Sequence, residues 1–486
     1  MNILPLLFFI GALLYGFPAA AMEAGTAETA YPIPATHVGA LFCVAVFIVS
    51  YIFVLLEERI HMPKSKPVML GAAIIWITIA LIAPGYDIGH EELHNAAIHG
   101  LEEYSSLLLF LLAAMTYINA MEDRKVFATL RVKLIEAGLN MRQLFWATGS
   151  IAFFLSPVAD NLTTALILGA VILALGKDDR KFVALSCINV VSAANAGGAF
   201  SPFGDITTLM VWQAGKVDFF EFVDLFIPSA VNFLVPAVAM SLFIPKDLPA
   251  PLHDDVHILR GGRRVILLGL CTIATAVSFE QALGLPPFLG MMAGLSFLLI
   301  LSYHVRITGR GRPEDNFDVL HLVKRAEWDT LLFFYGIIFS VSGLSFLGYM
   351  ELASSSMFGA LGASYTNVLL GVSSAVIDNI PVMFAVLSMN PDMSHFQWLL
   401  ITLTTGVGGS MLSIGSAAGV ALMGAAKGQY TFMSHLKWTP VLILGYAAAI
   451  GAHFLINGHM NVPHNALEGT SAQHSVEAVH KPEISH

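Results

Sequence analysis

The chain has 486 residues and carries little charge. Only 12% of them are Asp, Glu, Lys or Arg, whereas 56% are hydrophobic. Soluble domains carry about twice that share of charge, so the composition excludes a soluble globule and indicates a polytopic helical membrane protein. Three cysteines in apolar stretches, Cys43, Cys187 and Cys271, give neither a disulfide framework nor a metal-binding spacing. A formal net charge of -10 without a basic face argues against a nucleic-acid partner.

Apolar runs set the predicted fold. Residues 1–35 are expected to form a signal peptide, or a first transmembrane helix, followed by an external loop. Ten crossings and two re-entrant hairpins follow, so we predict an all-α membrane protein of about 11 transmembrane helices, or 10 plus a signal peptide. The predicted crossings are 37–56, 67–84, 105–121, 182–213, 222–244, 265–281, 286–303, 329–350, 397–426 and 436–457, and the hairpins are 143–176 and 357–389.

Basic residues lie almost entirely on one side of this arrangement. The loops 57–66, 122–142, 177–181, 245–264, 304–327 and 427–437 hold 3, 5, 3, 4, 5 and 2 of them, or 22 of the 24 in the chain. Only Lys216 and Lys481 fall on the other side. The positive-inside rule therefore places those six loops in the cytoplasm and the histidine-containing tail 458–486 outside, as in a bacterial inner membrane.

The most informative stretch runs from Ser156 to Thr164. It places one carboxylate, one amide and two hydroxyls, on Asp160, Asn161, Thr163 and Thr164, between apolar flanks that are each too short to cross a bilayer. Two half-helices that meet at a polar tip fit this pattern. Irregular backbone at membrane depth is tolerated only where it lines an enclosed cavity, and a buried acid there indicates a functional site.

The second half of the chain repeats the first. Glu103 parallels Glu327, and Asp160-Asn161 parallels Asp378-Asn379. We therefore predict a first repeat at 36–245, a cytoplasmic linker at 246–264 and a second repeat at 265–457. Five crossings per repeat is an odd number, so the second copy is inserted upside down. Inverted repeats with broken helices are typical of secondary transporters.

Each repeat also contains a long apolar segment with small residues at its centre. In 182–213 the sequence passes through Gly197-Gly198, Pro202 and Gly204, and in 397–426 it passes through Gly408-Gly409 and Gly415. Both segments should unwind there, which frees carbonyl groups and helix ends to hold an ion. The polar residues at these two breaks are Asn195, Asp205, Thr207, Thr208, Ser410, Ser413 and Ser416.

Three buried acids dominate the predicted site: Asp160, Asp205 and Asp378, with no Lys or Arg inside any predicted span. Hard oxygen ligands suit a hard cation such as Na⁺ or Li⁺. Burial favours the neutral form of a carboxyl group, and a nearby cation favours the ionised form. One aspartate can thus hold a proton or a metal ion, which is the minimal machinery of an exchanger. This chemistry needs no cofactor and no nucleophile.

Two features of the acidic external loop that precedes 105–121 offer alternatives. His90-Glu91-Glu92-Leu93-His94 matches the H-E-x-x-H pattern of zinc hydrolases, which leaves an intramembrane zinc hydrolase as a remote second function. His99 and Glu103 lie at the mouth of the next span and could respond to pH, because histidine titrates near neutrality. The plainer interpretation is a solvated surface histidine.

At these residues the sequence resembles the NhaD-type sodium/proton antiporters of the ion-transporter superfamily. The resemblance covers nearly all of 36–457 and is most specific at Ser156–Thr164, Asn195–Thr208, Ser374–Pro381 and Ser410–Ser416. It implies a mobile transport domain, made of the hairpins and broken helices, that moves against a dimeric scaffold in an elevator-like cycle. The polar cluster that it implies comprises Asp160, Asn161, Asn195, Asp205, Thr207, Thr208, Ser374, Asp378, Asn379, Ser413 and Ser416.

One departure bears on the substrate. The Ser-Asn-Thr tip motif of the anion-symporter branch is missing, and both tips carry Asp-Asn instead. This favours exchange of Na⁺ or Li⁺ for H⁺. A transporter of the same fold for arsenite, a carboxylate or a similar anion remains the alternative, because helix N-termini can bind anions without Lys or Arg.

Overall fold

The computed structural model describes residues 33–461, apart from 177–178, 249–255 and 310–315. Most of the predicted signal or first span, and the tail beyond 461, lie outside these residues. Every regular element in the described part is a helix. Eight of the helices are long and apolar enough to cross a membrane. They correspond to eight of the ten crossings predicted after residue 36, and the other two crossings are the interrupted helices.

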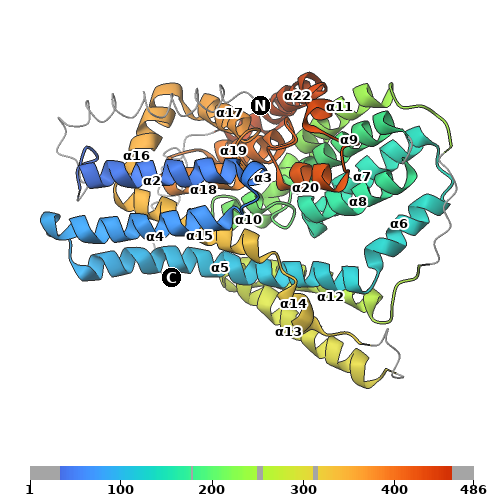
Figure 1. Cartoon of the computed structure of the whole chain (residues 1–486), viewed down its shortest axis with the longest axis horizontal. Helices are drawn as coiled ribbons and strands as arrows, with labels where there is room; N and C mark the ends of the chain where they lie inside the picture. The colour runs from blue at the N-terminus through green and yellow to red at the C-terminus, as the bar shows by residue number, and fades with distance from the viewer. Residues whose placement is uncertain (1–32, 177–178, 249–255, 310–315, 462–486) are drawn as a thin grey trace, which may run out of the picture.

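Six long helices form one layer, which we call the scaffold group (Figure 1). They are α2 (Val38–Leu55), α4 (Ser65–Ile82), α5 (His90–Asp123), α12 (Gly262–Leu283), α13 (Pro287–Ile307) and α15 (Trp328–Phe346). Helix α4 packs between α2 and α15, while α5 packs on α12, α13 and α15. This layer thus combines the first three long helices of each half of the chain.

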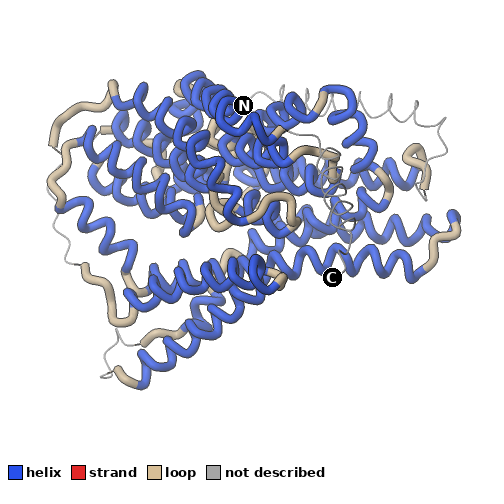
Figure 2. Tube along the Cα trace, turned by 180° about the vertical axis from the view of Figure 1, so that it is seen from behind, coloured by secondary structure: helices blue, strands red, loops and turns tan. Residues whose placement is uncertain are grey.

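The remaining helices form a second group, which we call the core group, and Figure 2 shows it beside the scaffold from behind. Helix α9 packs on α7, α8 and α11, and α19 packs on α10, α17 and α22. The two halves also interlock, since α20 packs on α8 and α10 packs on α18. Its members are α7 (Met141–Ala159), α8 (Asn161–Leu175), α9 (Arg180–Gly198), α10 (Ile206–Gln213), α11 (Phe226–Ser241), α17 (Ala363–Ser373), α18 (Asn379–Met389), α19 (His395–Gly408), α20 (Ala417–Ala425) and α22 (Thr439–Asn457).

The order of elements is the same in both halves. Three scaffold helices are followed by a connector, a pair of short helices, an interrupted helix and one long helix. The connector is α6 (Val126–Glu136) in the first half and α16 (Tyr349–Ser354) with the π-turn Ser355–Gly359 in the second. Short helices complete the described chain: α3 (Glu57–Ile60), Ala83–Tyr86, Phe219–Leu225, α14 (Val319–Lys324), α21 (Phe432–Leu436) and Gly458–Met460.

The acidic stretch before 105 is helical, so its prediction as a loop was wrong. Helix α5 begins at His90 and runs for 34 residues. No proline interrupts it, and Glu91 and Glu92 lie in its first turn, where carboxylates stabilise the positive end of a helix. Its polar beginning is therefore an extension of a membrane helix.

Glycine pairs allow the chain to fold back at each interrupted helix. A Cβ atom on Gly198 would lie 2.7 Å from the carbonyl oxygen of Gly204, and one on Gly409 would lie 2.7 Å from that of Gly415. Both distances are shorter than a van der Waals contact and involve backbone, which cannot move aside as a side chain can. The ends of each break can approach this closely only when a glycine occupies these positions.

We therefore expect Gly409→Ala to destabilise the protein by about 1–3 kcal/mol, as overpacking does elsewhere. Gly451→Ala in α22 is the matched control, because a Cβ atom there meets nothing within 4 Å. Thermal unfolding of the two purified variants in detergent measures the difference. Equal melting temperatures would show that the break relaxes without cost.

Candidate cation site

Asp205 is the centre of the polar network. Its side chain is buried, and one carboxylate oxygen, Oδ2, accepts hydrogen bonds from the amide groups of Asn161 at 3.1 Å and Asn379 at 2.9 Å. These asparagines begin the second helix of each short-helix pair, α8 and α18. A single carboxylate oxygen therefore joins two helix tips that lie more than 200 positions apart in the sequence.

The network continues into the second interrupted helix. Asn161 Nδ2 also donates to Asn195 Oδ1 at 3.1 Å, and Asn195 Nδ2 donates to Ser416 Oγ at 3.0 Å. Asp205 and Ser416 are the N-caps of α10 and α20, with nearly identical backbone angles (φ -146°, ψ 148° and φ -142°, ψ 149°). Ser416 thus has the same local geometry in the second half of the chain as Asp205 has in the first, but it carries a neutral hydroxyl.

Four helix N-termini meet in this network, those of α8, α10, α18 and α20. Each carries a partial positive charge from its unpaired N–H groups, which stabilises a nearby anion. In this protein the anion comes from the chain itself, as the carboxylate of Asp205. The arrangement favours an ionised aspartate at a depth where an isolated charge would be costly.

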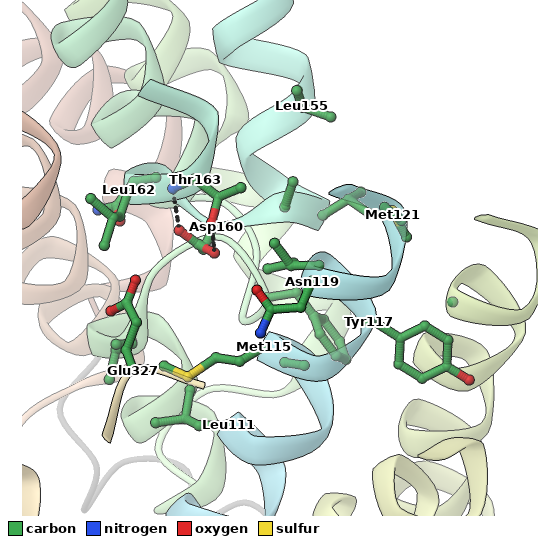
Figure 3. Close-up of a pocket in the computed structure, with 18 of the residues that line it drawn as sticks. Leu111, Met115, Tyr117, Asn119, Met121, Leu155, Asp160, Leu162, Thr163 and Glu327 are labelled. Carbon is green, nitrogen blue, oxygen red and sulfur yellow. Dashed lines mark hydrogen bonds between the residues drawn. The ribbon is translucent and has the colours of Figure 1, made fainter. Parts of the chain in front are cut away.

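Asp160 occupies a different local setting. It has a positive φ of 54° and caps α8, since Thr163 donates to its carboxylate through both the backbone N–H and the hydroxyl, each at 2.8 Å. Figure 3 shows the carboxylate of Glu327 pointing toward this pair across a cavity. The cavity measures about 480 Å³ and is also lined by Asp205 and Asn379.

Three basic side chains also line the cavity. Lys133 and Arg325, which come from two of the loops predicted to be cytoplasmic, line it together with Lys64. The cavity is therefore lined both by residues from predicted cytoplasmic loops and by Asp160 and Asp205.

Asp378 has different hydrogen-bond partners from Asp160, although the repeat places the two at equivalent positions. Its Oδ2 lies 3.3 Å from Lys64 Nζ, and it makes no side-chain cap to α18. The reason is local: three residues after Asp378 comes Pro381, which has neither the N–H nor the hydroxyl that Thr163 offers Asp160. Lys64 lies outside the predicted spans, as the N-cap residue of α4, and its side chain nevertheless reaches one of the acids.

The predicted hydroxyl ligands mostly bind backbone. Thr208 donates to the carbonyls of Ser201 and Asp205, Ser374 to those of Gly371 and Thr405, and Ser410 to that of Val407. Ser413 Oγ lies 3.7 Å from the sulfur of Met423. Thr164 and Thr207 are buried, and their hydroxyls have no hydrogen-bond partner in the described part of the chain. These two oxygens fit a role as cation ligands better than the others.

His99 and Glu103 do not join the network. They face each other on α5 with 3.7 Å between His99 Nε2 and Glu103 Oε1, and both side chains are well exposed. His90 and His94 are exposed at the start of the same helix.

Sequence reasoning missed three residues. Lys64 stood in a predicted loop, and Glu327 was noted only as the repeat partner of Glu103, so neither carried a signal that its side chain lies near the acids. His435, in α21 outside the eight candidate spans, is buried between the Tyr430 hydroxyl (2.7 Å) and the Ser410 carbonyl (3.0 Å). Burial lowers the pKa of His435 from 6.5 to about 4, so it stays neutral and fixes the carbonyl at the second break.

Comparisons with known proteins agree with this architecture. A family model described as "Citrate transporter" matches residues 51–406. The Na⁺/H⁺ antiporter NhaD of Alkalimonas amylolytica is 52% identical over 440 residues, which is 86% of this chain and 91% of that protein. The chain belongs to the NhaD family. This makes it an integral membrane protein and a secondary transporter, so the zinc-hydrolase alternative was wrong.

More distant relatives span a wide range of organisms. Sodium/proton antiporter 1 of Arabidopsis thaliana is 34% identical over 438 residues, covering 86% of this chain and 73% of its own. Among solved structures, the YdaH transporter of Alcanivorax borkumensis aligns with a TM-score of 0.50 at 11% identity, over 83% of this chain and 100% of that one. At such low identity the likeness concerns the fold alone.

Proposed function

We propose that this protein exchanges Na⁺, and also Li⁺, for H⁺ across a bacterial inner membrane. The observation that carries the proposal is the single carboxylate oxygen of Asp205 that accepts from Asn161 and Asn379 at the meeting point of four helix N-termini. Asp160 and Asp378 lie at the two tips beside it. Supporting the choice of ions, NhaD relatives that are about half identical to this chain are named as Na⁺/H⁺ antiporters.

The electrostatics favour a cation over an anion. An anion carrier of this architecture would use the helix N-termini to hold its substrate. Here Asp205 and the cap of Asp160 already occupy two of those termini with carboxylates. At the two tips the carboxylates of Asp160, Asp205 and Asp378 outnumber the single ammonium of Lys64. This local excess of negative charge attracts a hard monovalent cation and its competitor, the proton.

Transport follows from two mutually exclusive states of the same carboxylates. A cation that enters through the cavity on the basic side displaces protons from Asp160, Asp378 or Asp205, with Thr164 and Thr207 as further oxygen ligands. The core group, as an inverted repeat, then moves against the scaffold group in an elevator-like step and opens the site on the other face. A dimer formed through the scaffold, and a tail exposed outside, complete the proposal.

Everted membrane vesicles provide the test. With a pH-gradient dye, we expect NaCl and LiCl, but not KCl, to collapse a preformed gradient only when the protein is present. If no alkali cation collapses the gradient between pH 6 and 9, the proposed exchange is refuted. Uptake of a labelled carboxylate such as citrate would then support the anion carrier that the family description suggests.

A further inference from the structure

The ion pair between Lys64 and Asp378 joins the two groups of helices. Lys64 precedes α4 of the scaffold group, and Asp378 precedes α18 of the core group. Their charged atoms are 3.3 Å apart, both side chains are mostly buried, and the Lys64 ammonium also lies 4.6 Å from the centre of the Phe333 ring. A lysine held by a carboxylate and an aromatic face is positioned, not merely nearby.

Asp378 has little else to bind. Its second oxygen, Oδ1, is buried and has no hydrogen-bond partner in the described residues. Pro381 has no N–H to donate to it, whereas Thr163 donates to Asp160 at the equivalent position. A buried carboxylate oxygen without a donor is costly unless a cation or a proton reaches it. Lys64 thus neutralises one side of a carboxylate whose other side remains available.

The second repeat has no equivalent lysine. Helix α13, which corresponds to α4 in the order of elements, is preceded by Gly284, Leu285 and Pro286. Asp160 accepts its hydrogen bonds from Thr163 of α8, the helix that it caps. The pair is therefore an addition to one repeat, and the symmetry of the fold does not explain it.

We propose that Lys64 is a tethered competitor for the transported cation at Asp378. Its ammonium is itself a monovalent cation on a flexible stem. It pairs with Asp378 when that carboxylate holds no Na⁺, and Na⁺ must displace it in order to bind. Because the two residues belong to different helix groups, this displacement also releases a contact between scaffold and core. The inference rests on the proposed exchange of cations and assigns Lys64 a part in it.

Removing the competitor should tighten cation binding. In Lys64→Met, we expect the Na⁺ concentration at half-maximal exchange to fall by about 10-fold or more, the low end of the coupling between close charge pairs. The maximal rate should fall as well, since nothing then helps the cation to leave. Lys64→Arg should restore the wild-type concentration dependence to within about twofold, because it retains the charge. Lys66→Met, two positions away on an exposed side chain, is the matched control.

A second readout does not depend on transport. Titrating NaCl into purified protein and following the melting temperature reports cation binding directly, because a ligand of the folded state stabilises it. Lys64→Met should respond at lower NaCl than wild type or Lys66→Met. A purely structural lysine would instead lower the melting temperature without shifting the titration.

The outcomes separate the two proposals. If neither wild type nor any variant responds to alkali cations in either assay, cation exchange itself fails and the role of Lys64 falls with it. If wild type responds but Lys64→Met needs as much NaCl as wild type, or more, only the competitor role is overturned. Should Lys64→Met fail to fold, Lys64→Gln in the binding titration decides between the same outcomes.

Discussion

Asp205→Asn is expected to abolish cation-driven proton movement while leaving the protein folded. The change removes the charge from the oxygen on which Asn161 and Asn379 converge. Hydrogen bonds to a charged group are worth about 1.5–3 kcal/mol, compared with about 1 kcal/mol for neutral ones. The variant loses these stronger hydrogen bonds and the charge that attracts the cation. Its affinity for the cation should therefore fall by at least about 30-fold.

The structural cost of this substitution should be small. An asparagine can place its oxygen where Asp205 Oδ2 now accepts from both tips, but its NH₂ group then faces the Thr207 N–H that Asp205 Oδ1 accepts. One capping hydrogen bond is lost, which costs about 1 kcal/mol. The expected signature is therefore a nearly normal melting temperature together with absent exchange.

Asp179→Asn is the matched control for this experiment. Asp179 also caps a core helix, since it accepts from the N–H groups of Lys181 and Phe182, but it lies outside the network. Both variants are assayed in everted vesicles over a range of NaCl concentrations. Wild-type exchange by Asp205→Asn, or equal losses in both variants, would remove Asp205 from the proposed site.

The places where helices break were readable from the sequence. Asp160 and Asn161 interrupt an apolar run, and the glycines around 198, 204, 409 and 415 interrupt two others, because short flanks and small residues leave the chain no continuous helix. The backbone contacts between Gly198 and Gly204 and between Gly409 and Gly415 give those glycines a steric reason that spacing alone could not supply.

The partners of the acids were harder to predict. Lys64 lies 314 positions from Asp378, and in the sequence it was one of three basic residues in a loop. Nothing local marks it as a partner, since only the packing of α4 against the core brings it there. The repeat implied only that Asp160 and Asp378 are equivalent by position. Comparing Thr163 with Pro381 would have revealed the difference, because proline has no N–H to donate.

Asp160→Asn is expected to stop exchange with almost no loss of stability. Asparagine caps helices about as well as aspartate, and it is one of the few residues that tolerate a positive φ such as the 54° found here. The Thr163 N–H can therefore still donate to the amide oxygen, and the amide NH₂ can donate to the Thr163 hydroxyl, although the charge is lost. We expect the free energy of unfolding, followed through the melting temperature, to change by no more than about 0.5 kcal/mol. The rate of exchange should fall at least about 30-fold.

Glu327→Gln provides the comparison that gives this result its meaning. Glu327 faces Asp160 across the cavity (Figure 3). It is the N-cap residue of the scaffold helix α15, where its carboxylate accepts from the Thr330 hydroxyl at 3.2 Å. If Asp160 holds the ion and Glu327 only attracts it, the glutamine variant should raise the half-maximal Na⁺ concentration several-fold and keep the maximal rate. If exchange survives Asp160→Asn but not Asp205→Asn, Asp160 is only a helix cap. Asp205 and Asp378 would then carry the cation and the proton.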